Sequence, residues 1–306
     1  MRILVLGAGA TGGYFGGRLA QSGADVTFLV RPARAEALAR TGLVIRSPDG
    51  VDKVMVRTVT AETLDGPYDV VVLSCKAYGL DEAIAAITPA VGSDSVVVPL
   101  LNGLGHYQAL DAAFGPERVL GGLCHIVASV GPEGEIIRAT PMQRLTFGER
   151  AGGMSRRVEA LAEVCAKAAF ETVASPEVIQ AAWEKFSFLA ALAAGTCLMR
   201  ASIGVIMAAG GEAFMRGLYD ECAAVAASAG HAPSDKARGE ALALLVEDKS
   251  AATASMLRDL EAGRPTEGDH ILGDMVRRGA AAGVATPLLG TALTHVKAYE
   301  IRRRSA

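Results

Sequence analysis

The sequence predicts an α/β protein, with a parallel β-sheet in its N-terminal half and an all-helical C-terminal half. Up to residue 150, short apolar runs typical of strands alternate with helical stretches, as a parallel sheet requires. After Ser155 the chain becomes alanine-rich and helical, with few strand signals. The shift falls around residues 174–176, where we place the domain boundary; this gives an N-terminal domain of residues 1–174 and a C-terminal domain of residues 175–306.

The first predicted strand, residues 3–6, runs into the segment Gly7-Ala8-Gly9-Ala10-Thr11-Gly12. A helical stretch follows, and a second apolar strand covers residues 26–30. This order of strand, turn, helix and strand gives the G-x-G-x-x-G pattern its meaning as a dinucleotide-binding motif. Gly7 permits the tight turn, Gly9 lets the backbone approach a pyrophosphate, and Gly12 lets the helix pack closely on the strand. We therefore predict an N-terminal Rossmann-type dinucleotide-binding domain.

The end of the second strand indicates which dinucleotide binds. NAD-dependent folds usually carry an acidic residue there, which accepts hydrogen bonds from the ribose 2′-hydroxyl, whereas an arginine suits a 2′-phosphate. Arg31 stands at this position, and Arg34 follows one helical turn later. A guanidinium can bind a phosphate through two parallel hydrogen bonds. We therefore expect NADP(H) as the cofactor; two solvated surface arginines are the alternative.

Two further apolar runs, residues 69–75 and 95–101, are typical of strands buried on both faces of a parallel sheet. Lys76 follows the first run and Asn102 follows the second. Ligands of open parallel sheets bind beyond the carboxyl ends of the strands, so we expect both residues on the same edge as the glycine turn. Residues 119–148 contain strand-like pieces, which we expect to extend this sheet in antiparallel fashion.

The composition excludes several classes of protein. The chain has 306 residues, 51% of them hydrophobic, and a formal net charge of −3, which leaves no polybasic stripe for nucleic acid. The first strand begins too early for a signal peptide, and the most apolar stretch, residues 186–199, is too short to span a bilayer. The five cysteines are scattered, and the five histidines lack metal-ligand spacing. We expect a cytoplasmic protein with reduced cysteines, no membrane partner and no metal site.

Three residues of the C-terminal half could carry chemistry, although position alone also allows simpler accounts. Lys185 lies in an otherwise apolar helix, where its charge either reaches water along the helix surface or is used in a cleft. Glu267 comes at the start of a helix, where a carboxylate makes a favourable contact with the helix dipole. Ser255 would ordinarily be a small packing or surface residue. The residues alone leave these alternatives open.

Seven motifs, spread over nearly the whole chain, occur in a fixed order: Gly7–Gly12, Arg31, Ser74–Tyr78, Leu101–Gly105, Trp183–Phe186, Ala254–Asp259 and Pro265–Asp269. This succession resembles the ketopantoate reductases (2-dehydropantoate 2-reductases). The resemblance implies an NADPH-binding Rossmann domain joined to a mostly helical domain, the active site of that family lying in the cleft between its two domains. It also implies that Arg31 and Lys76 are basic residues that bind the cofactor.

By the same resemblance, Lys185 is the catalytic lysine, Glu267 the acidic residue opposite it, and Ser255 a substrate-contacting serine. Asn102 matches an asparagine near the nicotinamide that serves both cofactor and substrate. Transfer of a hydride to a ketone carbon leaves negative charge on the oxygen, which a lysine ammonium can stabilise and protonate. The implied reaction is the NADPH-dependent reduction of a small-molecule 2-oxo acid to a 2-hydroxy acid, with 2-dehydropantoate as the first candidate substrate.

Four positions depart from the family pattern, because apolar residues replace asparagines at Leu189, Ala193, Ile203 and Leu272. The catalytic pair is kept while the polar substrate contacts are lost. A related reductase for a more apolar carbonyl or imine substrate is therefore an alternative. A non-catalytic NADPH-sensing protein is another, since a fold does not fix a function. The sequence leaves a homodimer open.

Overall fold

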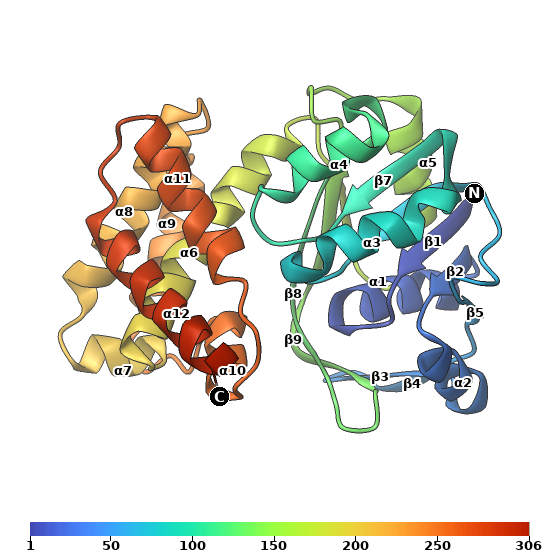
Figure 1. Cartoon of the computed structure of the whole chain (residues 1–306), viewed down its shortest axis with the longest axis horizontal. Coiled ribbons are helices and arrows are strands. Elements are labelled where there is room, and N and C mark those ends of the chain that lie inside the picture. Colours follow the sequence, from blue (N-terminus) through green and yellow to red (C-terminus); the bar gives the residue numbers. More distant parts are fainter. Residues whose placement is uncertain (306) are drawn as a thin grey trace. The chain divides into compact units, whose positions relative to one another are not determined.

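The computed structural model describes residues 1–305, which form two compact units (Figure 1). The first unit consists of Met1–Leu101 and His106–Ile179, and the second of Asn102–Gly105 and the chain from Gln180 onward. The predicted fold class is confirmed: a parallel sheet with helices comes first, and a helical part follows. A domain boundary between residues 174 and 175 stays a prediction.

A parallel five-stranded sheet, in the order β5-β2-β1-β6-β7, forms one layer of the first unit. Its strands are β1 (Arg2–Leu6), β2 (Asp25–Leu29), β5 (Arg57–Val59), β6 (Tyr68–Leu73) and β7 (Val91–Pro99). The helical segments that follow these strands are α2 (Pro32–Thr41), η1 (Ala77–Gly79), α3 (Leu80–Ile87), η2 (Thr88–Ala90), α4 (His106–Phe114) and η3 (Pro116–Arg118). The apolar runs of β1, β6 and β7 are buried, as expected for strands of a parallel sheet whose two faces are covered.

A second, mixed sheet completes the first unit. Its strands are β3 (Leu43–Ser47), β4 (Gly50–Val54), β8 (Gly121–Val130), β9 (Ile136–Gly148) and β10 (Glu171–Ala174), and α5 (Arg156–Cys165) precedes β10. β8 and β9 pair antiparallel, but the expectation that they extend the parallel sheet is wrong. β9 pairs with β8 and also with β3 and β10, so its backbone groups are used within this second sheet.

Helix α1 (Ala10–Gln21) contacts strands of both sheets and is rich in glycine. Gly12 and Gly16 lie one turn apart and face the parallel sheet: a Cβ on Gly16 would lie 2.8 Å from a side chain of β2. Gly13 and Gly17 face the second sheet, where a Cβ on Gly13 would lie 2.9 Å from a side chain of β9. Each glycine in a helix interior costs about 1 kcal/mol relative to alanine. The close packing that the glycines allow offsets this cost and brings α1 close to the ends of β1 and β6.

The regular secondary structure in the described part of the second unit is helical, and it includes a π-helix, η4. Its elements are α6 (Val178–Met199), α7 (Ile203–Ala208), α8 (Glu212–Ser228), α9 (Asp235–Leu245), α10 (Ser255–Glu261), η4 (Asp269–Gly273), α11 (Asp274–Ala281) and α12 (Pro287–Ser305). α8 packs against α9, α11 and α12, and η4 packs against α11 and α12. Within residues 1–305, no helix has the length and apolar character needed to cross a membrane.

Candidate functional site

The glycine turn after β1 has the geometry expected of a pyrophosphate-binding turn. Gly7 has a φ of +82°, which favours glycine, and its N–H donates to the carbonyl of Leu29 at the end of β2. A Cβ on Gly9 would meet open space, so a ligand can approach the backbone there. A Cβ on Gly12 would lie 2.2 Å from Oγ of Ser74, which follows β6. Gly12 is thus required for packing, and Gly9 leaves the face of the turn clear.

Helix α1 begins directly at this turn. Gly9 precedes it in an extended conformation and has no side chain with which to cap it. Its first residues, Ala10, Thr11 and Gly12, are uncharged. The free N–H groups of such a helix end, together with the helix dipole, favour an anion. The turn and the helix therefore fit the pyrophosphate of a dinucleotide.

The ends of the central strands lie level with one another. Leu6 of β1 pairs with Leu29 of β2 and with Leu73 of β6. The segments that follow these residues therefore leave the sheet at the same edge, as we predicted for Lys76 and the glycine turn. Lys76 is exposed and directly precedes η1. The proposed binding of the cofactor by Lys76 stays a prediction.

The two arginines after β2 have different surroundings. Arg31 is exposed at the start of α2. Arg34 is partly buried, and its Nη2 donates to the carbonyl of Gly134 at 2.6 Å and to that of Ala8 in the glycine turn at 3.3 Å. Burial lowers the pKa of the Arg34 guanidinium. Arg31 therefore keeps its guanidinium at the surface, where a phosphate can reach it, whereas Arg34 holds backbone carbonyls.

Within the second unit, Lys185 and Asn102 are brought together although 83 residues separate them in the chain. Lys185 lies in the second turn of α6 and is half-buried, and its Nζ donates to Oδ1 of Asn102 at 3.0 Å. The backbone carbonyl of Asn102 also lies 3.0 Å from Nε2 of His270 in η4. Sequence reasoning missed His270, because a single histidine carries no spacing signal.

The other two predicted residues also belong to the second unit. Glu267 is 7% exposed and lies just before η4, where its backbone carbonyl accepts a hydrogen bond from the N–H of Ile271 at 2.9 Å. π-Helical segments occur frequently at functional sites, so this irregular stretch supports a functional role for its neighbourhood. Ser255 is exposed and is the first residue of α10. The roles of Glu267 and Ser255 stay predictions.

The four apolar replacements are accommodated without buried polar atoms. Leu272 and Ile203 are fully buried, and Ala193 is 3% exposed. Leu189 is half-buried on α6, one turn after Lys185. Asparagines at the three buried positions would need hydrogen-bond partners, since a buried unpaired amide costs about 1–3 kcal/mol. The apolar residues instead contribute to the core of the second unit.

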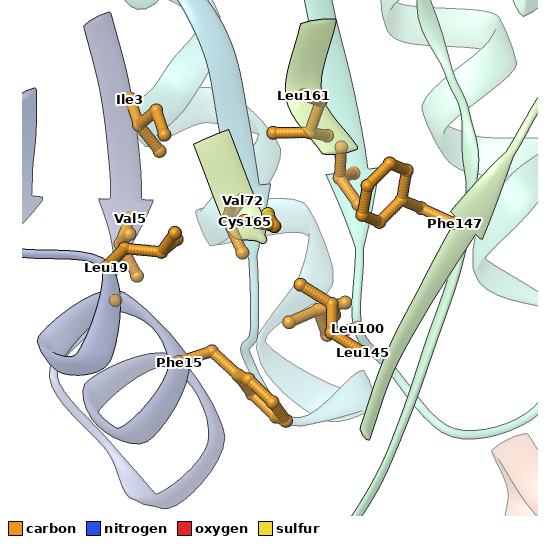
Figure 2. Close-up of a pocket in the computed structure, with 12 residues that line it drawn as sticks. Ile3, Val5, Phe15, Leu19, Val72, Leu100, Leu145, Phe147, Leu161 and Cys165 are labelled. Atoms are coloured by element: carbon orange, nitrogen blue, oxygen red, sulfur yellow. The ribbon is translucent and has the colours of Figure 1, made fainter. Parts of the chain in front are cut away.

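A cavity inside the first unit does not have the character of a substrate site (Figure 2). The labelled side chains around it are apolar, apart from one thiol: Ile3, Val5, Phe15, Leu19, Val72, Leu100, Leu145, Phe147, Leu161 and Cys165. Burial raises the pKa of the Cys165 thiol to about 12, which makes it unreactive. Binding sites for polar ligands need a few polar groups that fix orientation. We assign this cavity to the packing of the core.

The first unit combines a Rossmann-type sheet with an open glycine turn, and the second holds a lysine–asparagine pair; these features fit a dinucleotide-dependent oxidoreductase. Residues 3–152 match the family described as ketopantoate reductase PanE/ApbA, and residues 177–300 match the C-terminal part of that family. The chain belongs to the ketopantoate reductase family. The predicted family and the predicted enzyme class, an oxidoreductase, are thereby confirmed, and a nicotinamide cofactor is supported.

Individual relatives agree with this assignment. The chain is 39% identical to the uncharacterized oxidoreductase YkpB of Bacillus subtilis, over 99% of this chain and 100% of that protein. It is 28% identical to a 2-dehydropantoate 2-reductase of Mesorhizobium japonicum, over 99% of each chain. The crystal structure of 2-dehydropantoate 2-reductase from Methylococcus capsulatus aligns with a TM-score of 0.89 and 30% identity, covering 100% of this chain and 99% of that one. The similarity therefore extends over both units.

Proposed function

We propose that the protein reduces a 2-oxo acid to a 2-hydroxy acid with NADPH, and that 2-dehydropantoate is its first candidate substrate. The observation that carries this proposal is the hydrogen bond from Lys185 Nζ to Asn102 Oδ1. It gives a lysine in an apolar helix a fixed polar partner, in a family of ketopantoate reductases. A lysine that merely extended its charge to water would not need such a partner.

The glycine turn and Arg31 would hold the cofactor. The N–H groups at the start of α1 would bind the pyrophosphate, and the exposed guanidinium of Arg31 would bind the 2′-phosphate. Lys76, at the same edge of the sheet, would add a second positive charge. When bound, the nicotinamide supplies the hydride.

Lys185 would act as the general acid. Negative charge that develops on the substrate oxygen is stabilised by the ammonium, which then delivers its proton. Asn102 would keep the ammonium in place by accepting a hydrogen bond from it at Oδ1. Glu267 would orient the lysine or a substrate hydroxyl, and Ser255 would contact the substrate.

The second candidate is a reductase of the same kind for a more apolar carbonyl or imine substrate. The observation that favours it is the replacement of four family asparagines by Leu189, Ala193, Ile203 and Leu272. A site that hydrogen-bonds a substrate hydroxyl rejects analogues without it strongly, whereas an apolar wall discriminates by only about 1–3 kcal/mol per methylene. We therefore expect weak selection for the hydroxyl of 2-dehydropantoate.

A substrate panel tests both candidates. NADPH oxidation is measured with 2-dehydropantoate, with 2-oxoisovalerate, which lacks the hydroxymethyl group, and with longer apolar 2-oxo acids. We expect turnover of several of them, with a preference for 2-dehydropantoate below about a hundredfold in kcat/KM. A larger preference would contradict the apolar-substrate candidate. NADPH binding without turnover of any carbonyl or imine would support the sensing protein instead. A homodimer stays a prediction, which sedimentation would test.

A further inference from the structure

His270 is placed against the loop that carries Asn102. Its Nε2 lies 3.0 Å from the backbone carbonyl oxygen of Asn102, in a partly buried contact between residues 168 positions apart. A carbonyl oxygen can only accept, so the Nε2 atom of His270 must carry the hydrogen. In this contact the imidazole of His270 therefore donates from Nε2 to the loop.

Two glycines of the loop after Asn102 lie next to the imidazole of His270. Gly103 has a φ of +80°, and a Cβ on it would lie 3.5 Å from the ring of His270. A Cβ on Gly105 would lie 3.4 Å from Cε1 of the same ring. Both glycines thus lie beside His270, at positions where an added Cβ would come into van der Waals contact with the ring.

Asn102 is consequently held at two points. His270 donates to its backbone carbonyl, and Lys185 donates to its side-chain Oδ1, both at 3.0 Å. If the first contact is lost, the backbone of Asn102 is less restrained and its Oδ1 no longer has a defined position relative to the lysine. Misplacement of a reacting group by about 1 Å can cost on the order of a hundredfold in rate.

We propose that His270 is a positioning residue, which holds the backbone of Asn102 so that Asn102 Oδ1 fixes the Lys185 ammonium in its catalytic place. This inference rests on the proposed function of Lys185. The part assigned to His270 is to hold Asn102 through Nε2, and delivery of the proton stays with Lys185. We expect the main effect of His270 on the rate of the chemical step.

Two amide variants of different reach test the contact. The amide nitrogen of glutamine stands near the place of Nε2, and that of asparagine nearer the place of Nδ1. We expect His270→Asn to lower kcat by about tenfold to a hundredfold, with the Kd for NADPH within about twofold of the wild type. His270→Gln should recover most of the rate. Equal kcat values for His270→Asn and the wild type would overturn the proposal.

A double-mutant cycle shows whether His270 acts through Asn102. In an Asn102→Ala background, where no side chain is left to be positioned, His270→Asn should change kcat by less than about twofold. An undiminished loss in that background would overturn the proposal. Thermal unfolding of each variant detects general damage, and His270→Phe, which keeps a ring but no donor, replaces His270→Asn if that variant does not fold. If Lys185→Ala keeps full activity, the proposed function fails, whatever the His270 variants do.

Discussion

The glycine turn of the first unit and the lysine cluster of the second are built in different ways. The turn consists of six consecutive residues, and it presents backbone N–H groups beside glycines that leave space for a ligand. The cluster joins side chains and a carbonyl from three distant segments, which carry Asn102, Lys185 and His270. We therefore expect substitutions in the turn to act through sterics on the binding of any dinucleotide, and substitutions in the cluster to act through charge and position on the reaction.

The largest expected effect belongs to the lysine cluster. Lys185→Ala removes the proposed acid and should lower kcat by about 10²–10⁴, because a positioned general acid contributes that much. NADPH binding, followed by fluorescence titration, should stay normal. Lys236→Ala, on the exposed face of α9, is the matched control and should keep full activity. Near-normal turnover of Lys185→Ala would contradict the assignment of the chemical step to the lysine cluster.

Substitution of the two arginines after β2 should affect cofactor binding in different ways. Arg31→Ala loses a charge-assisted contact worth about 1.5–3 kcal/mol, so it should weaken NADPH binding by roughly tenfold to a hundredfold and leave NADH unchanged. Arg34→Ala frees the carbonyls of Ala8 and Gly134, so it should weaken both cofactors alike. Titration of each variant with NADPH and NADH measures this. A wild-type protein that prefers NADH, or an Arg31→Ala variant that loses both cofactors equally, would contradict the assignment.

The packing role of the turn can be tested by stability alone. Gly12→Ala places a Cβ 2.2 Å from Ser74 Oγ, and such overpacking typically costs about 1–3 kcal/mol in the free energy of unfolding. Gly239→Ala, in the interior of α9, meets no atom within 4 Å among the described residues. It should stabilise the protein by about 0.5–1 kcal/mol, as alanine does in helices. Urea unfolding measures the free energy of unfolding of both variants. Equal changes in this free energy would show that the close packing of α1 at Gly12 does not limit the stability of the protein.

The smallest expected effect depends on pH. Hydrogen bonds from Arg157, and also from Ser155, hold the pKa of Glu149 below its usual value of 4.5. A carboxylate with a lower pKa in the folded state stabilises the fold above pH 4.5, and this contribution is lost as the pH falls through the folded pKa. Glu149→Gln should therefore cost about 1 kcal/mol at pH 7 and less towards pH 3.5. Glu163→Gln, exposed on α5, is the control, and a pH-independent difference would contradict the interpretation.

Local sequence patterns predicted much of the first unit. Features that depend on contacts between residues far apart in the chain could not be predicted. The glycine turn could be predicted because its function lies in consecutive residues, and strand order placed Lys76 on the same edge. The sheet to which β8 and β9 belong could not be predicted, since an alternating pattern indicates a strand but not its partner. Whether Arg31 or Arg34 faces solvent depends on the carbonyl of Gly134, 100 residues from Arg34. His270 was missed for the same reason.

The segment Asn102–Gly105 belongs to the second unit, although the chain on both sides of it belongs to the first. The polypeptide therefore passes between the units after Leu101, after Gly105 and again after Ile179. A gene fragment that starts at residue 180 would encode Lys185 and His270 but not the asparagine that both contact. Neither half is thus a transferable module, and recombination at a single junction would join a lysine from one parent to an asparagine loop from another.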